Sequence, residues 1–176
     1  MIDEERYANA LAFAQKKHDG QFRIGGLPYI THPIAVAEIV KGKGGATDAV
    51  ITALFHDLLE DTDATEEDIV RFGNEKILHS VKLLTKQKNY VMQDYVDGIR
   101  KDHMAFEVKG ADRLHNLRCA VCADTDFKIK YIYETVSWYL DFLPEIPTAV
   151  KDLAKTLDTP LSDLPFLYEP IDNLKI

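Results

Sequence analysis

Apolar residues recur every three or four positions along most of this chain, which is the pattern of amphipathic α-helices. Over about 3–17 they include Tyr7, Ala10 and Ala14, which would share one helical face. Pro33 suits the first turn of a helix that runs to about Val40. Further helices are predicted at about 47–61, 65–73, 74–85, 89–101, 104–123 and 127–142. Strand-like alternation is almost absent, so the sequence predicts an all-α fold.

The most apolar of these segments begins at Thr47, its expected N-cap, and continues to Asp61. Because it is so strongly apolar, we expect it to be the central helix of the fold. Thr65 and Asp68 resemble a capping box at the start of the next helix. No Gly-, Ser- or Pro-rich linker divides the chain, so residues 1–176 are expected to form one domain with a proline-containing tail over 144–176.

The chain carries 29 acidic and 21 basic side chains, which gives a net charge of -8. Such a surface repels a nucleic-acid backbone, so no polymeric nucleic acid is expected as a partner. We find neither the apolar core of a signal peptide nor a run of apolar residues that could span a membrane, so a cytoplasmic protein is expected. Cys119 and Cys122 are interpreted as small, buried, reduced thiols rather than as a zinc site. The sequence does not indicate an oligomeric state.

Four polar side chains follow one another closely near the end of the central apolar segment: His56, Asp57, Glu60 and Asp61. Residues four apart on a helix lie one turn from each other, so His56 and Glu60 would project close together, as would Asp57 and Asp61. Charged groups on an apolar helix need partners or a metal ion, because an unpaired buried charge is costly. Alternatively, the helix end tips into solvent, and this segment alone does not decide between the two.

Two other segments favour a metal ion. His32 precedes Pro33 at the entrance of a helix, and Asp112 lies on a late helix. His32, His56, Asp57 and Asp112 would together offer two imidazoles and two carboxylates. This donor set suits Mn²⁺, Fe²⁺ or Zn²⁺ with positions open for water and substrate. A metal ion held in this way can polarise a phosphoryl oxygen, which favours phosphate-ester chemistry.

Taken in order, the polar motifs resemble the hydrolase domain of the RelA/SpoT alarmone enzymes. They are HDGQFR from His18, GLPYITHP from Gly26, HDLLEDT from His56, Phe72-Gly73, Leu84-Thr85-Lys86 and ADRLHNLR from Ala111. The similarity covers about residues 5–140. It implies the helical bundle of the HD domain. Since no synthetase or regulatory domain fits in the remaining length, a single-domain small alarmone hydrolase of the metazoan SpoT-homologue type is expected.

The resemblance also implies an activity and a cofactor. The expected reaction is Mn²⁺-dependent removal of the 3′-pyrophosphate of ppGpp or pppGpp, which releases pyrophosphate and GDP or GTP. The metal ligands implied by the motifs are His32, His56, Asp57 and Asp112. Glu60 and Asp61 match the acidic pair that orients or activates the attacking water, a role in which one carboxylate can accept the water's proton.

Three residues match substrate contacts of the family. Arg23 matches the arginine that packs on the guanine base, where a planar guanidinium can stack and donate hydrogen bonds. Asn116 matches a nucleoside contact, and Lys130 matches a phosphate-facing cation on the following helix. The chain departs from the family pattern at Ile24, Gly110 and Cys119. These departures leave the base and the 5′-phosphate preference open.

Other functions therefore stay in consideration. With the same metal centre, the protein would be a (p)ppApp hydrolase, an NADPH 2′-phosphatase or another HD nucleotidase. A third hypothesis is a regulator that binds an alarmone without turning it over, although the intact Glu60 and Asp61 argue against it.

The remaining histidines have simpler interpretations. His79 and His103 lie outside every motif and are expected to be exposed, and His115 is expected to be structural. His18 either ends the first helix at the surface or supports the loop that carries Arg23.

Overall fold

A computed structural model describes residues 2–23 and 25–157, and over these ranges the protein consists of helices and their connections. The one pairing of extended backbone there is an isolated bridge between Phe22 and Pro28. This confirms the all-α prediction. The chain divides into two compact units, of which the first ends at Asp112 and the second begins at Arg113. Most of the predicted proline-containing tail, from 158 on, lies outside the described residues.

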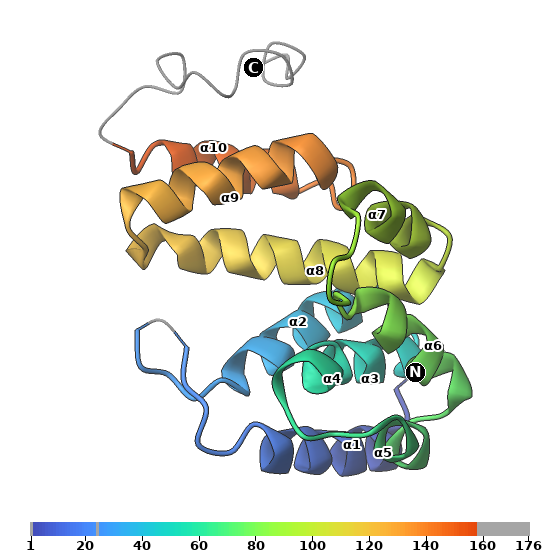
Figure 1. Cartoon of the computed structure of the whole chain (residues 1–176). Helices are drawn as coiled ribbons and strands as arrows, with labels where there is room; N and C mark the ends of the chain where they lie inside the picture. The colour runs from blue at the N-terminus through green and yellow to red at the C-terminus, as the bar shows by residue number, and fades with distance from the viewer. Residues whose placement is uncertain (1, 24, 158–176) are drawn as a thin grey trace. The chain divides into compact units, whose positions relative to one another are not determined.

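The first unit is built around one buried helix. Its elements are α1 (Glu4–Lys17), α2 (Thr31–Gly42), α3 (Thr47–Phe55), α4 (Leu58–Asp61), α5 (Glu66–Phe72), α6 (Glu75–Leu84), α7 (Met92–Arg100) and the first part of α8 (His103–Cys119) (Figure 1). Helix α3 packs against α1, α2 and α6. Every side chain from Ala49 to Phe55 is buried, because α3 has apolar neighbours on all sides. The prediction of a central apolar helix is confirmed.

The prediction of one continuous helix over 47–61 is wrong. Helix α3 ends at Phe55 and α4 begins at Leu58, so His56 and Asp57 form the junction between them. On an unbroken helix, consecutive side chains point about 100° apart and do not face each other. The interruption allows these two neighbouring polar side chains to converge on one point.

The caps of two helices test the sequence signals directly. Thr65 accepts a hydrogen bond from the backbone N–H of Asp68, and the Asp68 carboxylate accepts one from Thr65, so the predicted capping box is confirmed. The predicted cap at Thr47 is wrong, because Ala46 occupies the N-cap position of α3. The hydroxyl of Thr47 instead accepts a hydrogen bond of 3.0 Å from the backbone N–H of Asp3. It thereby ties the start of the chain to α3.

The second unit contains the end of α8, a short 3₁₀ turn η1 (Ala120–Cys122), α9 (Thr125–Trp138) and α10 (Ile146–Ala154). Helices α9 and α10 lie side by side (Figure 1). Helix α10 falls in the segment that the sequence indicated only as a tail. Its proline at 147 lies in the first turn of the helix, where a missing N–H is tolerated, and so it does not interrupt the helix.

A buried arginine joins α8 to α9 within this unit. The guanidinium of Arg113 lies 4.3 Å from the ring centroid of Tyr131 and 4.2 Å from that of Tyr139. Its Nη2 forms an ion pair of 2.5 Å with Glu134. Only 2% of Arg113 is exposed, so this is a desolvated cation between two aromatic faces.

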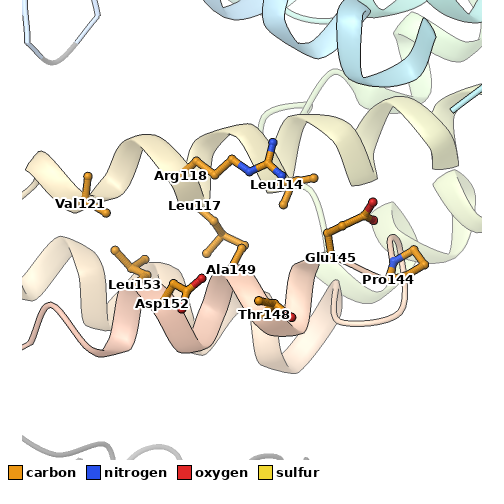
Figure 2. Close-up of a pocket in the computed structure, with 10 residues that line it drawn as sticks. All are labelled: Leu114, Leu117, Arg118, Val121, Pro144, Glu145, Thr148, Ala149, Asp152 and Leu153. Atoms are coloured by element: carbon orange, nitrogen blue, oxygen red, sulfur yellow. The ribbon is translucent and has the colours of Figure 1, made fainter. Parts of the chain in front are cut away.

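The second unit also has a groove of about 560 Å³ between α8 and α10. Figure 2 shows Leu117 from α8 facing Ala149 from α10, with charged side chains at Arg118, Glu145 and Asp152. No histidine or cysteine is among the residues that line it. This groove therefore lacks the imidazole and thiolate ligands that a transition metal prefers.

Candidate metal centre

The four side chains predicted as metal ligands all belong to the first unit. His32 is the second residue of α2, His56 follows α3 directly, Asp57 precedes α4, and Asp112 lies on α8. Both imidazoles and the Asp112 carboxylate are almost fully buried, with exposed fractions of 1%, 4% and 6% for His32, His56 and Asp112. The start of α2, the junction between α3 and α4, and the middle of α8 thus supply these groups.

The polar atoms of these residues converge. His56 Nε2 lies 3.2 Å from His32 Nε2 and 3.1 Å from Asp57 Oδ2. The ligand atoms of His32, His56 and Asp57 lie within 4.8 Å of one another, so these three residues form a group that could hold a metal ion. Asp112 approaches from the other side, with its Oδ1 3.2 Å from His32 Nε2 and 3.8 Å from His56 Nε2. The structure therefore brings all four predicted ligands together.

The backbone fixes the orientation of one imidazole. His56 Nδ1 lies 2.7 Å from the carbonyl oxygen of Ala53, and since a carbonyl only accepts, Nδ1 carries a proton and donates. The lone pair of neutral His56 is then on Nε2, the atom that faces the other three residues. Histidines that bind metal ions commonly have their second ring nitrogen bonded in this way.

The pKa shifts within the cluster favour ionised carboxylates, which can bind a cation. Burial lowers the pKa of His32, which keeps that imidazole neutral. Burial opposes the charged form of His56 as well, but the charge and hydrogen bond of Asp57 outweigh it and raise the pKa of His56 to about 9. Despite burial, the imidazoles hold the pKa of Asp57 below its usual range, and Lys109 does the same for Asp112. Both carboxylates are therefore ionised at neutral pH.

Lys109 completes the surroundings of Asp112. Its Nζ lies 2.9 Å from Asp112 Oδ2, while Asp112 Oδ1 is the oxygen that faces His32. The pair has the i, i+3 spacing of neighbours on one helical face. Lys109 thus holds one oxygen of this carboxylate and leaves the other directed at the cluster.

The two members of the acidic pair have different partners. Glu60 accepts a hydrogen bond of 3.0 Å from the backbone N–H of Lys86. Asp61 accepts one of 3.2 Å from the hydroxyl of Tyr29, and the same hydroxyl lies 2.8 Å from Oδ2 of Asp57. Burial and the nearby Asp57 charge raise the pKa of Asp61 above its usual value. Asp61 is thus the member that shares a partner with a predicted metal ligand.

The residues predicted to contact substrate are less closely associated. Arg23 lies in the first unit, with its guanidinium 5.9 Å from the ring centroid of Tyr29. Asn116 and Lys130 belong to the second unit, on α8 and α9. Lys130 is exposed and Asn116 is partly buried. The roles of these three residues stay predictions.

The remaining histidines and the cysteines give mixed outcomes. His79 and His103 are exposed, with side-chain fractions of 68% and 86%, as predicted. His18 is 2% exposed, so the surface alternative for it is wrong. Cys119 and Cys122 are exposed, and the expectation of buried thiols is also wrong. Cys119 is the last residue of α8 and Cys122 the last of η1, and the residue buried between them is Ala120.

Sequence reasoning missed three residues that contact the site: Tyr29, Lys109 and Gln21. Tyr29 and Gln21 stand inside motifs that carried the resemblance, and Lys109 precedes Asp112 by three residues. The i, i+3 spacing is a signal that would have found Lys109. Tyr29 had no such signal, because its contacts with Asp57 and Asp61 depend on the path of a loop.

A comparison with known proteins places this geometry in context. The chain matches the family model of the HD domain over residues 10–139. It is 38% identical over 137 residues to the guanosine-3′,5′-bis(diphosphate) 3′-pyrophosphohydrolase of Haemophilus influenzae, with 72% of this chain and 20% of that protein covered. It is 32% identical over 146 residues to the bifunctional (p)ppGpp synthase/hydrolase SpoT of Escherichia coli, with 77% and 21% covered. The chain therefore spans about a fifth of the length of these curated relatives.

A solved structure supports the fold. This structure is of a metazoan ortholog of SpoT that hydrolyses ppGpp. It matches the fold of our protein with a TM-score of 0.70 at 22% sequence identity. The match covers 88% of this chain and 97% of the other. Within the described ranges of our protein, no helix has the length and apolar character that a membrane span requires.

Proposed function

This chain belongs to the HD-domain family, and we propose that it is a metal-dependent hydrolase that removes the 3′-pyrophosphate of ppGpp or pppGpp. The products are pyrophosphate and GDP or GTP. We infer the substrate from the relatives, which are a guanosine-3′,5′-bis(diphosphate) 3′-pyrophosphohydrolase and a (p)ppGpp synthase/hydrolase. The proposed cation is Mn²⁺, because a mixed set of imidazole and carboxylate ligands suits it.

One observation carries the proposal: the polar atoms of two imidazoles and two carboxylates meet at one point inside the first unit. Both aspartates are ionised and directed at the histidines, and Lys109 pairs with Oδ2 of Asp112 while Oδ1 faces His32. Imidazole nitrogens together with carboxylate oxygens are a donor set that divalent transition metals prefer. The donor set and its burial therefore fit a divalent metal ion.

The contacts suggest a role in catalysis for each residue of the site. When bound, the cation would polarise a phosphoryl oxygen and offset the charge that develops there. Asp61 and Glu60 would orient the attacking water, and the raised pKa of Asp61 suits a carboxylate that accepts the water's proton. Arg23 would pack on the base, since a guanidinium plane stacks on aromatic rings.

A turnover screen tests this proposal. Purified protein is incubated with ppGpp, pppGpp, ppApp and NADPH, with Mn²⁺ or with a chelator, and the products are separated. We expect pyrophosphate from ppGpp and pppGpp with Mn²⁺ only. Orthophosphate from NADPH instead, or tight ppGpp binding without turnover at any metal tested, would contradict the proposal.

Two variants link the reaction to the site. Asp57→Ala is expected to abolish both bound metal and turnover, because it removes one of the two carboxylates that face the histidines. His79→Ala is the matched control, since His79 is an exposed histidine that belongs to none of the motifs. It should leave both quantities unchanged.

A further inference from the structure

The loop between α1 and α2 folds back on itself and presents Tyr29. The backbone N–H of Arg23 donates to Leu27 at 2.8 Å, and that of Tyr29 donates to Gln21 at 2.9 Å. Gly26 has a φ of 83°, which a residue without a side chain adopts at little cost, so the turn can be tight. Residues 21–23 therefore pair with residues 27–29, and this pairing holds Tyr29 in place just before the start of α2.

Two imidazoles hold the ring of Tyr29. Its centroid lies 4.8 Å from that of His18 and 6.0 Å from that of His32, the latter in an edge-on arrangement. His18 is itself buried, with Nδ1 2.8 Å from Oε1 of Gln21. The ring thus has rigid neighbours on both the α1 side and the metal-cluster side.

The hydroxyl of Tyr29 connects the candidate metal cluster with the acidic pair. It lies 2.8 Å from Oδ2 of Asp57 and 3.2 Å from Oδ2 of Asp61. Asp57 and Asp61 are separated by one turn of α4, and their like charges repel each other across the gap. The phenol hydroxyl of a tyrosine can donate a hydrogen bond, and here it lies between two carboxylate acceptors.

The same loop also holds Asp61 by its backbone. Gln21 Nε2 donates to the carbonyl oxygen of Asp61 at 2.7 Å, which directs the amide oxygen of Gln21 toward His18. Asp61 is therefore held at its main chain by Gln21 and at its side chain by Tyr29. Glu60 has neither contact and is bonded to the backbone of Lys86 instead.

We propose that Tyr29 is a positioning residue that holds the Asp61 carboxylate beside the metal ligand Asp57, and that its contribution to catalysis passes through Asp61 and not through Glu60. This inference rests on the proposed function. On this view the loop between α1 and α2 holds Asp61 but not Glu60. Tyr29 contributes no atom to the reaction.

The test is a pair of double-mutant cycles with metal binding measured in parallel. Tyr29→Phe removes only the hydroxyl and keeps the ring between its two imidazoles, so the fold is retained. We expect kcat to fall by about 10–100-fold, the effect typical of losing a partner that orients a metal-site ligand, while KM changes by less than about twofold. Tyr7→Phe removes a phenol hydroxyl on α1, away from the site, and should leave kcat unchanged.

Repeating Tyr29→Phe in two variant backgrounds shows which carboxylate transmits its effect on kcat. In Asp61→Asn, removal of the Tyr29 hydroxyl should lower kcat by less than about threefold, because residues that act together show non-additive effects. In the matched background Glu60→Gln, the loss should stay at its full size. Equal losses in both backgrounds, or full kcat in Tyr29→Phe, would overturn the proposal.

Metal binding gives a readout that does not depend on turnover. Calorimetric titration with Mn²⁺ should show a weaker affinity for Tyr29→Phe, by up to about tenfold, because Asp57 loses its orienting donor. An unchanged Mn²⁺ affinity would overturn the bridging role. If wild-type protein binds Mn²⁺ but hydrolyses none of the nucleotides, the proposed function fails, while this titration still decides whether Tyr29 orients Asp57.

Discussion

Raising the pH from 6.5 to 9 should destabilise the metal-free protein through His56. The pKa of this buried imidazole is raised from 6.5 to about 9, chiefly because Asp57, at 3.1 Å, outweighs the effect of burial. A group whose pKa is higher in the folded state stabilises the fold fully below its unfolded pKa, and the contribution is lost as the pH rises through the folded pKa. Each unit is worth 1.36 kcal/mol, so the expected loss is about 3 kcal/mol.

The assay is urea unfolding in the presence of a chelator, at pH 6.5 and pH 9, for wild type and His56→Gln. The glutamine variant does not titrate, so the difference between the two proteins isolates the imidazole from thiols and amines that titrate in the same window. His32 does not interfere, because its pKa is lowered and its own effect falls below pH 6.5. An identical loss of stability in the two proteins would refute the reasoning.

The same proton makes metal binding depend on pH. A cation needs the neutral imidazole, so Mn²⁺ must displace the proton of His56 between pH 7 and the folded pKa of about 9. The affinity for Mn²⁺ should therefore rise by about tenfold per pH unit in this range, with about one proton released per ion bound. Calorimetry in two buffers of different ionisation enthalpy measures that release.

Three further predictions concern the surroundings of the site. Glu60→Ala should retain Mn²⁺ but lower kcat by about 10²–10⁴-fold in steady-state assays, and an unchanged kcat would remove Glu60 from the mechanism. Gln21→Ala should lower the free energy of unfolding by about 1–3 kcal/mol in urea titrations, because buried His18 Nδ1 loses its acceptor, and a change below the experimental error would contradict that role. Arg113→Lys should cost about 2 kcal/mol or more, since an ammonium does not stack between two tyrosine rings, and a neutral result would show that the stacking contributes nothing.

The sequence predicted most of the fold because helix signals are local. Apolar periodicity and the capping box at Thr65 depend on residues within one or two turns, and both agree with the structure. The junction at His56 was missed for the opposite reason. Its residues have good helical neighbours, and the turn there is stabilised by contacts with His32 and Asp112, which are distant in sequence.

In the candidate site, too, local sequence signals identified some residues, while residues placed by the path of the chain were missed. Residue chemistry and motif order identified the four side chains that converge, together with the acidic pair. They did not identify Tyr29, whose hydroxyl reaches Asp57 and Asp61 because residues 27–29 pair with residues 21–23. The exposure of Cys119 was missed as well, because the buried position there is occupied by the neighbouring Ala120.

The most direct test of this account is the stoichiometry of Mn²⁺ binding, measured by equilibrium titration for wild type and for alanine variants at the four predicted ligands. We expect one ion per chain in wild type and in His103→Ala, whose histidine is exposed and distant from the cluster. We expect no tight binding in Asp57→Ala or Asp112→Ala. Wild-type affinity in both aspartate variants would contradict the claim that these four side chains hold one divalent cation.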